Sequence, residues 1–288
     1  MRVLVLGATG MLGHTVFEHF LAAGDHEVWG TVRGDHGLDV FTAAEQARLR
    51  RGVDVLDEPG LQATLDDLAP DVIINCIGVI KQLQAAHDPL VVLPINSMLP
   101  HRLARWCAKA GARLIHISTD CVFDGTRGGY GESDRADTTE LYGQSKFIGE
   151  VIDQPNVLTL RVSIIGHELS SHHSLVDWFL SQEGTAKGYT RAIFSGLPTV
   201  ELARLIRTVV LPRPDLHGLY HVSAAAISKC ELLQIVARVY GKSIAIVPDD
   251  SVIIDRSLNS QRFSDATGYV APSWPALVEA MHASRRSA

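Results

Sequence analysis

The chain has few cysteines and no long apolar stretch. Its four cysteines, Cys76, Cys107, Cys121 and Cys230, form neither a CxxC pair nor another metal-type spacing among the 288 residues. Such a sparse set is typical of reduced thiols in a reducing compartment. No apolar stretch approaches the ~20 residues of a membrane span, and the first residues lead into a strand pattern rather than a signal-peptide cleavage site. We therefore expect a soluble, cytoplasmic globular protein with no membrane partner.

The chain also lacks a concentrated charge of either sign. Its 26 basic and 32 acidic residues give a net charge of −6, and no run of lysine or arginine is longer than a pair. Nucleic acids are bound by a concentrated basic face. We therefore expect no nucleic-acid partner.

The histidines do not make up a metal set. His172 and His173 are adjacent, so their side chains diverge, and His14 and His19 are five residues apart on a predicted helix. No cysteine or carboxylate framework surrounds them in the spacing that metal sites use. We expect no metal.

What the chain does have is an alternation of short apolar runs with longer segments of helical spacing. The predicted strands are residues 3–6, 26–32, 53–56, 72–77, 113–118, 157–163 and 219–222. The predicted helices are residues 12–23, 60–68, 96–110, 141–152, 174–181, 199–210 and 228–240. Unbroken apolar strands separated by helices indicate parallel strands covered on both faces. Right-handed crossovers then predict an α/β fold with a doubly wound, Rossmann-like sheet.

The rhythm changes after Gly166, and the predicted helix 174–181 is followed by a glycine-rich, strand-poor stretch that runs to Leu197. We expect residues 1–165 to form the main domain and residues 166–288 a smaller C-terminal α/β lobe. Some core elements of that lobe are expected to return to the first domain.

The first strand runs directly into a glycine-rich turn and then a helix. The turn reads Gly7-Ala8-Thr9-Gly10-Met11-Leu12-Gly13. Glycines in this context let the backbone turn sharply and approach a pyrophosphate, whose charge the helix N-terminus stabilises. The spacing is GxxGxxG rather than GxGxxG. We predict dinucleotide binding by Gly7, Thr9, Gly10, Met11 and Leu12.

The residue at the end of the second predicted strand indicates which dinucleotide is bound. An acidic residue there binds a free ribose 2′-hydroxyl, whereas an arginine accommodates a 2′-phosphate. Arg33 therefore favours NADPH over NADH, although NADH stays possible. Asp54 and Val55, at the end of the third predicted strand, are placed to cradle the adenine.

Tyr142 and Lys146 are four residues apart and so share one helix face. Reduction of a carbonyl requires a proton donor, and a tyrosine serves best when a nearby cation lowers its pKa. Lys146 supplies that cation. Thr119 follows a buried strand at the sheet edge where ligands bind, and we expect its hydroxyl to polarise the same substrate oxygen.

These pieces together resemble the extended short-chain dehydrogenase/reductase superfamily. The segments that carry the likeness are GATGMLG, IINCIG, ISTDCVFDG and YGQSK, in that order. Within the superfamily the chain is most similar to dTDP-4-dehydrorhamnose reductase-like nucleotide-sugar reductases, firmly over residues 1–165 and loosely beyond.

The resemblance implies a catalytic set of Thr119, Tyr142 and Lys146. Further cofactor contacts implied by it are Cys76, Ile77, Gly78, Ser118 and Ser163. In such enzymes the C-terminal lobe holds the nucleotide-sugar, and the implied substrate contacts are Cys121, Val122, Phe123, His167, Lys187 and Arg256, the last two at the diphosphate. A homodimer built on helices 96–110 and 141–152 is also implied.

Cys121 departs from the pattern of the rhamnose-pathway reductases, which usually carry tyrosine there. The sugar pocket is therefore expected to differ. The 4,6-dehydratases carry an Asp-Glu pair after the threonine, whereas this chain has Asp120-Cys121.

The leading hypothesis is NADPH-dependent reduction of the 4-keto group of a nucleoside-diphospho-6-deoxy-hexose. One alternative is an epimerase-reductase that exchanges protons through Cys121 and His167, because GDP-fucose synthase uses a cysteine and a histidine at comparable places. Another is a non-catalytic, dinucleotide-sensing regulatory subunit.

Overall fold

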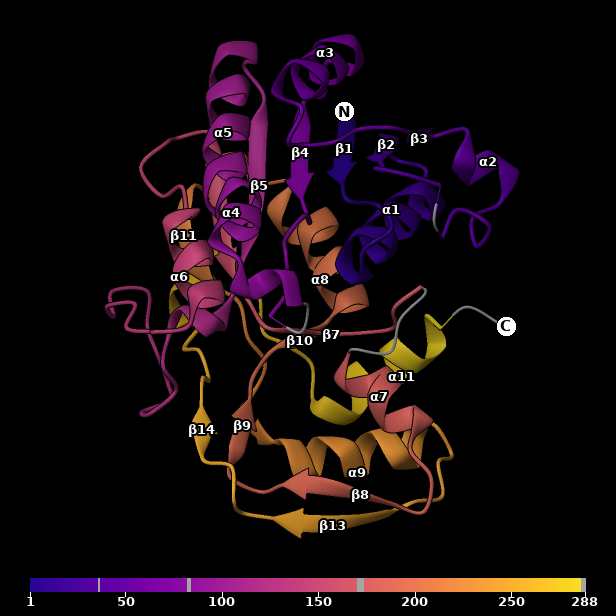
Figure 1. The fold of residues 1–288 in the computed structure, drawn as a ribbon, viewed down its shortest axis with the longest axis vertical. Coiled ribbons are helices and arrows are strands. Elements are labelled where there is room, and N and C mark those ends of the chain that lie inside the picture. The colour runs from indigo at the N-terminus through magenta and orange to yellow at the C-terminus, as the bar shows by residue number, and fades with distance from the viewer. Residues whose placement is uncertain (36, 82–83, 170–173, 286–288) are drawn as a thin grey trace.

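The structure is a computed structural model that describes residues 1–35, 37–81, 84–169 and 174–285. Within those ranges, seven parallel strands form one sheet in the order β11-β6-β5-β4-β1-β2-β3 (Figure 1). The strands are β1 (Arg2–Leu6), β2 (Glu27–Thr31), β3 (Leu49–Arg50), β4 (Val72–Asn75), β5 (Arg113–Ser118), β6 (Val157–Arg161) and β11 (Gly218–His221). The order reverses between β1 and β4, so their carboxyl ends border the crevice where open α/β sheets bind ligands.

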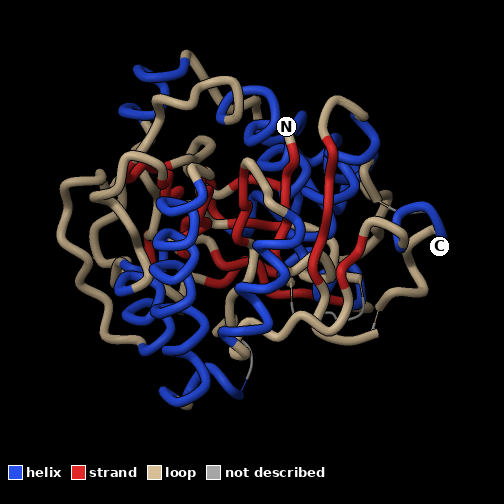
Figure 2. The backbone as a smooth tube through the Cα atoms, turned by 90° about the horizontal axis from the view of Figure 1, so that it is seen from above, coloured by secondary structure: helices blue, strands red, loops and turns tan. Residues whose placement is uncertain are grey.

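Helices cover both faces of this sheet, as Figure 2 shows from above. Val3 and Val5 pack in one core cluster with residues of α1 (Met11–Ala23) and α8 (Thr199–Leu205). Leu4 and Leu6 point to the other face, into a cluster with α3 (Glu58–Leu68) and α5 (Leu99–Ala110). Successive residues of a strand alternate between faces, which explains why β1 is apolar from Val3 to Leu6. The predicted doubly wound α/β class is confirmed.

The rest of the chain beyond β6 forms a smaller lobe at the carboxyl edge of the sheet (Figure 1). Its strands are β7 (Ile164–Ile165), β8 (Thr185–Tyr189), β9 (Ala192–Phe194), β10 (Leu197–Pro198), β12 (Ile227–Ser228), β13 (Ala245–Asp249) and β14 (Ile254–Asp255). Its helices are α7 (Leu175–Ser181), α9 (Lys229–Val239) and α11 (Trp274–Ala283), whereas α10 (Gln261–Thr267) packs against β11 of the large sheet. β11 and α8 return to the large sheet. The boundary at residue 165 stays a prediction.

The remaining short elements lie on the first part of the chain. They are α2 (Ala43–Gln46), α4 (Pro89–Val92), a π-helical turn (Leu93–Met98) that leads into α5, and α6 (Leu141–Ile148). α6 ends four residues earlier than predicted, and Gly149, which caps it, lies against the Asn96 carbonyl oxygen. A Cβ on Gly149 would lie 2.0 Å from that oxygen.

Two predicted features are wrong. Residues 53–56 form no strand; β3 lies at Leu49–Arg50, and Val55 is apolar because it packs in the core cluster beside α3. The stretch 182–197 is not strand-poor, since it contains β8, β9 and β10. β8 was hidden because alternate residues are exposed, so it has no continuous apolar run.

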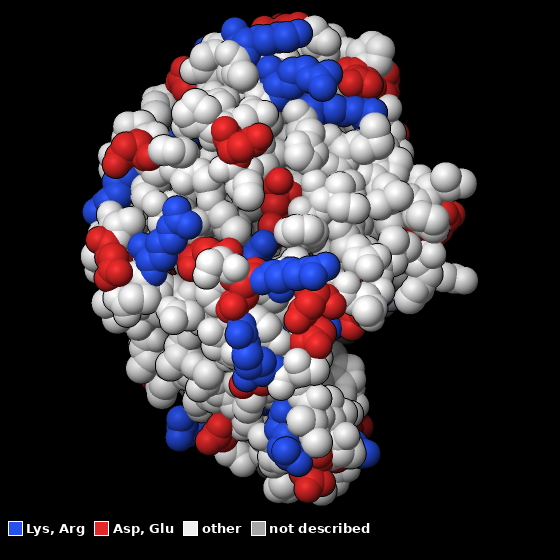
Figure 3. Space-filling model, turned by 90° about the vertical axis from the view of Figure 1, so that its left-hand side faces the viewer, with Lys and Arg blue, Asp and Glu red and all other residues white. Residues whose placement is uncertain are grey.

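Figure 3 shows basic and acidic side chains interspersed on the side that holds α5 and α6. Among the described residues, no helix has the length and apolar character needed to cross a bilayer.

Candidate active site

The turn between β1 and α1 is packed so closely that only glycine fits. Gly7 has a φ of +80°, and a Cβ there would lie 2.8 Å from Cγ1 of Ile77. A Cβ on Gly13 would lie 1.9 Å from the Gly7 carbonyl oxygen. These glycines therefore bring the start of α1 down onto the end of β1, as a dinucleotide-binding turn requires.

The amino end of α1 carries no side-chain cap. α1 begins at Met11. Its N-cap residue is Gly10, which has no side chain that could accept a capping hydrogen bond. Thr9 and Met11 are partly exposed, Gly10 is exposed, and Leu12 is buried. The first N–H groups of a helix need a partner, and together with the helix dipole they suit a phosphate. The residues present thus fit a dinucleotide.

Arg33, Asp54 and Val55 come together beyond the ends of β2 and β3. The Val53 N–H donates to the Val32 carbonyl oxygen at 3.1 Å, which ties the two segments side by side. The side chains of Arg33 and Asp54 are exposed. Although no strand precedes Asp54 directly, these residues share the sheet edge predicted for the adenosine half.

The loop after β4 lies against the glycine turn. Asn75 ends β4, and its Oδ1 accepts from the Ile77 N–H at 3.2 Å, which fixes the loop. Cys76 and Ile77 are partly exposed and Gly78 is exposed. Burial raises the pKa of the Cys76 thiol to about 12. The thiol is therefore protonated at neutral pH.

Thr119 and Tyr142 meet where the turn after β5 touches the first turn of α6. Thr119 Oγ1 accepts from the Cys121 N–H at 3.1 Å and caps a short 3-10 turn, Asp120–Val122. A Cβ on Gly143 would lie 2.1 Å from the Cys121 carbonyl oxygen, so glycine is needed for α6 to start there. The Thr119 hydroxyl donates to Asp120 Oδ1 at 3.2 Å, and its proximity lowers the pKa of the Tyr142 phenol.

Lys146 lies one turn further along α6 and is buried. Its Nζ donates to the Ile117 carbonyl oxygen at 2.7 Å. Burial lowers the pKa of Lys146 to about 8, against the opposing effects of Glu150 and Cys76. The three predicted catalytic side chains thus gather at the end of β5.

The electrostatics of Tyr142 differ from the sequence-based expectation. Burial raises the pKa of the phenol, and Cys121 adds to the rise, whereas Thr119 and Arg256 lower it. Lys146 is expected from the sequence to lower this pKa, and the structure adds Arg256 as a cation with that effect. A phenol with a raised pKa stays protonated at neutral pH, as a proton donor must.

Arg256 follows β14 and reaches into this cluster. Its Nη1 donates to Cys121 Sγ at 3.4 Å and its Nη2 to Glu140 Oε1 at 2.9 Å. Its side chain is buried, and its Nε has no hydrogen-bond partner among the described residues. Burial raises the pKa of Cys121 to about 11. Arg256 and Cys121, both predicted at the substrate, therefore lie together.

Val122 and Phe123 were predicted at the substrate, but their side chains are fully buried. Phe123 stacks on Tyr130 with ring centroids 4.1 Å apart, and the Arg161 guanidinium lies 5.2 Å from its ring centroid. The two side chains therefore support the turn from beneath instead of lining its surface.

Ser118 and Ser163 end neighbouring strands of the sheet. Ser118 closes β5, and its hydroxyl donates to Glu150 Oε1 at 2.7 Å. Ser163 follows β6 and is partly exposed, and its carbonyl oxygen accepts from the Leu197 N–H at 2.8 Å. Both lie at the predicted edge.

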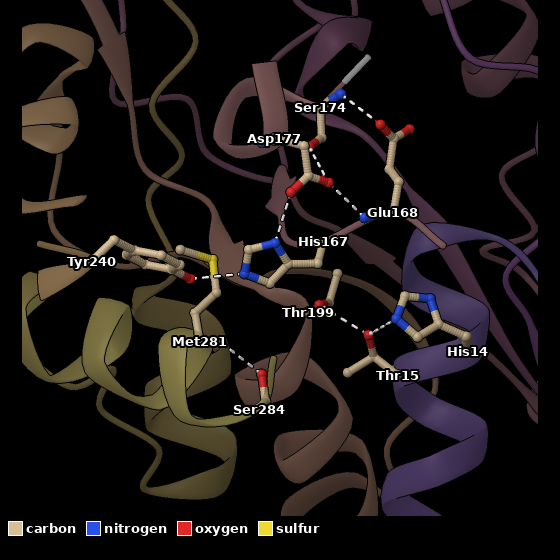
Figure 4. Close-up of polar contacts among 10 residues, drawn as sticks. All are labelled: His14, Thr15, His167, Glu168, Ser174, Asp177, Thr199, Tyr240, Met281 and Ser284. Atoms are coloured by element: carbon tan, nitrogen blue, oxygen red, sulfur yellow. Dashed lines mark hydrogen bonds and ion pairs between the residues drawn. The ribbon is translucent and has the colours of Figure 1, made fainter. Parts of the chain in front are cut away.

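His167 belongs to a different group of polar contacts (Figure 4). Its Nδ1 lies 2.7 Å from Asp177 Oδ1 and its Nε2 2.8 Å from the Tyr240 hydroxyl. Both ring nitrogens thus have partners within the small lobe. No contact in the described residues joins His167 to Cys121.

Lys187 also lies apart from the catalytic side chains. It sits on β8 with 69% of its side chain exposed, and its Nζ lies 2.9 Å from Asp249 Oδ2 on β13. Its electrostatic partners are Asp249 and Tyr189. The structure therefore separates Lys187 from Arg256, with which it was paired at the diphosphate.

Lys229 is a candidate that sequence reasoning missed. It opens α9, directly after the capping residue Ser228. Burial lowers the pKa of its ammonium, and Lys81 and Arg256 add to that effect, whereas Asp120 opposes it. Lys229 therefore interacts electrostatically with the residues around Arg256. The capping box predicted the helix but gave no signal of where its first side chain points.

Asn96 and Ser145 were missed as well. The Asn96 amide holds the backbone of Val79 through two bonds, at 2.9 and 3.0 Å, and donates to Ser145 Oγ at 3.1 Å. This bond joins the π-helical turn to α6 between Tyr142 and Lys146. The buried polar pair fixes the catalytic helix.

The described residues contain no group of three or more side chains suited to a metal ion. His14 lies at the start of α1, where its Nδ1 is 2.9 Å from the Gly10 carbonyl oxygen. The pair His172 and His173 lies outside the described residues.

Comparison with known families now places the chain. Residues 1–251 match the model of the RmlD substrate binding domain family. The chain belongs to this family. The resemblance to dTDP-4-dehydrorhamnose reductase-like proteins, stated from the motifs, is confirmed.

Three relatives show the range of similar proteins. The chain is 30% identical over 266 residues to the probable low-salt glycan biosynthesis reductase Agl14 of Haloferax volcanii, covering 88% of this chain and 85% of that one. It is 32% identical over 172 residues to methionine adenosyltransferase 2 subunit beta of Rattus norvegicus, covering 58% and 48%. The alignment thus spans about half the length of that subunit.

The third is a solved structure, the dTDP-4-dehydrorhamnose reductase of Bacillus anthracis in complex with NADP. It superposes with a TM-score of 0.80 at 22% identity and covers 99% of both chains. At this identity the likeness shows the shared fold.

Proposed function

We propose that this chain catalyses the NADPH-dependent reduction of the 4-keto group of a nucleoside-diphospho-6-deoxy-hexose, in the making of activated sugars for polysaccharides. The observation that carries the proposal is the meeting of Thr119, Tyr142 and Lys146 at the end of β5, beside the glycine turn. Membership of the RmlD family and the reductases among its relatives support the same reaction.

NADPH would lie along the carboxyl edge of the sheet. The glycine turn would hold its pyrophosphate, and Arg33 its 2′-phosphate. The loop Cys76 to Gly78 and Ser163 would flank the nicotinamide half. When bound, the reduced nicotinamide supplies a hydride. NADH stays possible because Arg33 is the one sequence feature that distinguishes the two.

The residues of the chain would supply the proton. The protonated Tyr142 phenol would donate it to the carbonyl oxygen, while the nearby Thr119 hydroxyl would hold that oxygen in place. Lys146, buried and fixed at Ile117, orients the nicotinamide ribose. Hydride and proton together convert the ketone to an alcohol.

The substrate would lie between this edge and the small lobe. Arg256 donates to Cys121 Sγ at 3.4 Å, and Lys229 and Lys81 interact electrostatically with Cys121. Because charge-assisted hydrogen bonds to phosphate are strong, these cations suit the diphosphate of a nucleotide-sugar.

Turnover of NADPH tests the proposal. Purified chain is mixed with NADPH and a panel of dTDP-, UDP- and GDP-linked 4-keto sugars, and loss of the reduced-nicotinamide absorbance is followed. We expect at least one sugar to be reduced, with Tyr142→Phe as the inactive control. If no sugar in the panel consumes NADPH, the proposal fails.

A second candidate is a dinucleotide-binding regulatory subunit without catalysis. The similarity to methionine adenosyltransferase 2 subunit beta favours it. NADPH binding in calorimetry without any turnover, together with a changed rate of a partner enzyme, would support this candidate over the reductase.

The epimerase-reductase alternative receives no support from the site geometry. Burial raises the pKa of Cys121 to about 11, which disfavours the thiolate. His167 has partners on both nitrogens. Incorporation of solvent deuterium at C3 or C5 of the product would support the epimerase-reductase, provided that the Cys121→Ala variant no longer incorporates it.

A homodimer is also proposed. Four exposed apolar side chains lie on or beside α5 and α6: Met98, Phe147, Ile148 and Ile152. Burying them against a second copy would remove apolar area from water. Light scattering should give the dimer mass for the wild type and the monomer mass for Ile148→Lys; a wild-type monomer contradicts the proposal.

A further inference from the structure

A buried ion pair lies directly behind the catalytic lysine. Glu150, two residues after α6 ends, binds Arg161 of β6 through both carboxylate oxygens, each at 2.7 Å. Each of the two side chains is 3% exposed. Desolvation makes such a pair no more stabilising than a well-packed apolar pair. Its presence beside the site therefore calls for a role other than stability.

The last two residues of β5 form hydrogen bonds with Lys146 and with Glu150, which follows it by four positions. The Ile117 carbonyl oxygen accepts from Lys146 Nζ at 2.7 Å, and the Ser118 hydroxyl donates to Glu150 Oε1 at 2.7 Å. The end of α6 is thus tied to the end of β5 at two points. The ammonium and the carboxylate are fixed relative to the same strand end.

On the basis of the proposed reductase function, we propose that Glu150 is a positioning residue for Lys146. Its carboxylate, held by Arg161 and Ser118, keeps the Lys146 ammonium charged and fixed at the end of β5, where it must meet the nicotinamide ribose.

The charges around Lys146 fit this role. Burial alone drives the pKa of Lys146 down to about 8, while Glu150 from the end of α6 and Cys76 from the loop after β4 oppose the fall. Cys76 is itself protonated at neutral pH, because burial raises its pKa to about 12. Glu150 is therefore the fixed negative charge that acts on the ammonium.

The neighbouring strand adds no competing charge. His116 of β5 is fully buried, and burial together with Lys146 holds its pKa well below 6.5. Its imidazole is neutral at neutral pH. Its Nδ1 lies 3.2 Å from the Asn75 amide, so the ring is held by a neutral partner.

The deciding variant is Glu150→Gln, which removes the charge and keeps an oxygen acceptor. Carbon-13 labelling of the lysine ε-methylene lets the pKa of Lys146 be read by NMR titration. We expect this pKa to fall by roughly one unit, the size of effect that an opposite charge exerts over a few ångström. The basic limb of kcat/KM should move to lower pH by the same amount. An unmoved titration in folded Glu150→Gln overturns the proposal.

Glu150→Gln leaves Arg161 buried without its partner, which can unfold the chain. The double variant Glu150→Gln/Arg161→Gln removes both charges. Because Arg161 is not among the groups that act on Lys146, this variant should lower the pKa of Lys146 as well. An unchanged pKa there overturns the proposal equally.

Glu201→Gln is the matched control. Glu201 is also a buried carboxylate, bound by Arg204 and Tyr269 far from α6 in sequence. It should lower the melting temperature without moving the titration of Lys146. The titration needs no substrate. If wild-type chain reduces no sugar, the proposed function fails, whereas the NMR result still decides the role of Glu150.

Discussion

The carboxyl edge of the large sheet and the small lobe beyond it arrange their polar side chains in different ways. At the edge, Thr119, Tyr142 and Lys146 come from two separate segments and meet around the end of β5. In the small lobe, His167 and Lys187 bind partners within the lobe itself. The edge therefore combines side chains from separate segments of the chain, whereas these two lobe residues bind partners within the lobe.

Two lysines of the lobe make the contrast sharper. Lys187 is 69% exposed and paired with Asp249, whereas Lys229 is partly buried and acts on the cluster of Asp120, Cys121 and Arg256. Both residues are lysines, so their different surroundings follow from their positions in the fold. Strand β8 faces outward, whereas the start of α9 faces the sheet edge (Figure 1).

The largest effect is expected from Tyr142→Phe. Removing the phenolic hydroxyl removes the proposed proton donor but keeps the ring, so kcat should fall by about 10²–10⁴-fold. The Kd for NADPH should stay within a factor of a few. Steady-state kinetics with the best sugar of the panel measures this. A loss of tenfold or less would assign the proton to another group.

Lys229→Met tests the difference between the two lysines. Loss of a charge-assisted bond to an anionic substrate should raise KM by about 10–100-fold with kcat little changed. Lys187→Met is the matched variant from the same lobe, and its KM should equal that of the wild type. Equal effects in both variants would mean that the contrast between β8 and the start of α9 has no bearing on substrate binding.

The elements that form the carboxyl edge of the sheet could be predicted from the sequence because local sequence patterns specify them. The glycine turn before α1, the end of β5 at Ser118 and the Tyr142–Lys146 spacing each depend on neighbours along the chain. Parallel strands deliver their carboxyl ends to one edge. Once the strands were assigned, the meeting of these residues followed.

The features that the sequence did not predict depend on contacts between distant segments of the chain. Arg256 reaches Cys121 across 135 positions of sequence, and no local pattern marks such a pairing. Phe123 was predicted to contact the substrate, but its side chain packs in a core cluster with Tyr130 and Leu258. β8 was missed because its pairing with β13, not its composition, makes it a strand.

Arg33→Ser tests the adenosine end of the edge with a smaller effect. Arg33 is exposed beyond β2, so its bond to a 2′-phosphate is partly screened by solvent. The Kd for NADPH should rise by roughly tenfold, since one charged contact is lost, while the Kd for NADH should not change. Calorimetric titration of both cofactors gives the two values. Equal affinities in the wild type would remove the reason to assign NADPH.

The smallest effect concerns the polar group of the small lobe. Burial raises the pKa of Asp177, but bonds from His167, Ser174 and the Glu168 N–H outweigh it and hold the pKa below its ordinary 3.8. A carboxyl with a depressed folded pKa stabilises the protein above its unfolded pKa, and that stability is lost as pH falls through the folded value. Asp177→Asn should therefore lower the melting temperature at pH 7 by roughly 3–12 °C, from about 1.5–3 kcal/mol for bonds to a charged group.

The gap between wild type and Asp177→Asn should narrow as pH falls below about 4, because the wild-type carboxyl then gains its proton. Asp67→Asn is the control, since Asp67 is 66% exposed in a surface pair with Arg50 and such pairs contribute little. Thermal melts across the acid range measure both variants. A gap that stays constant with pH would mean that the Asp177 charge does not hold His167, and the small lobe would then owe its order to packing alone.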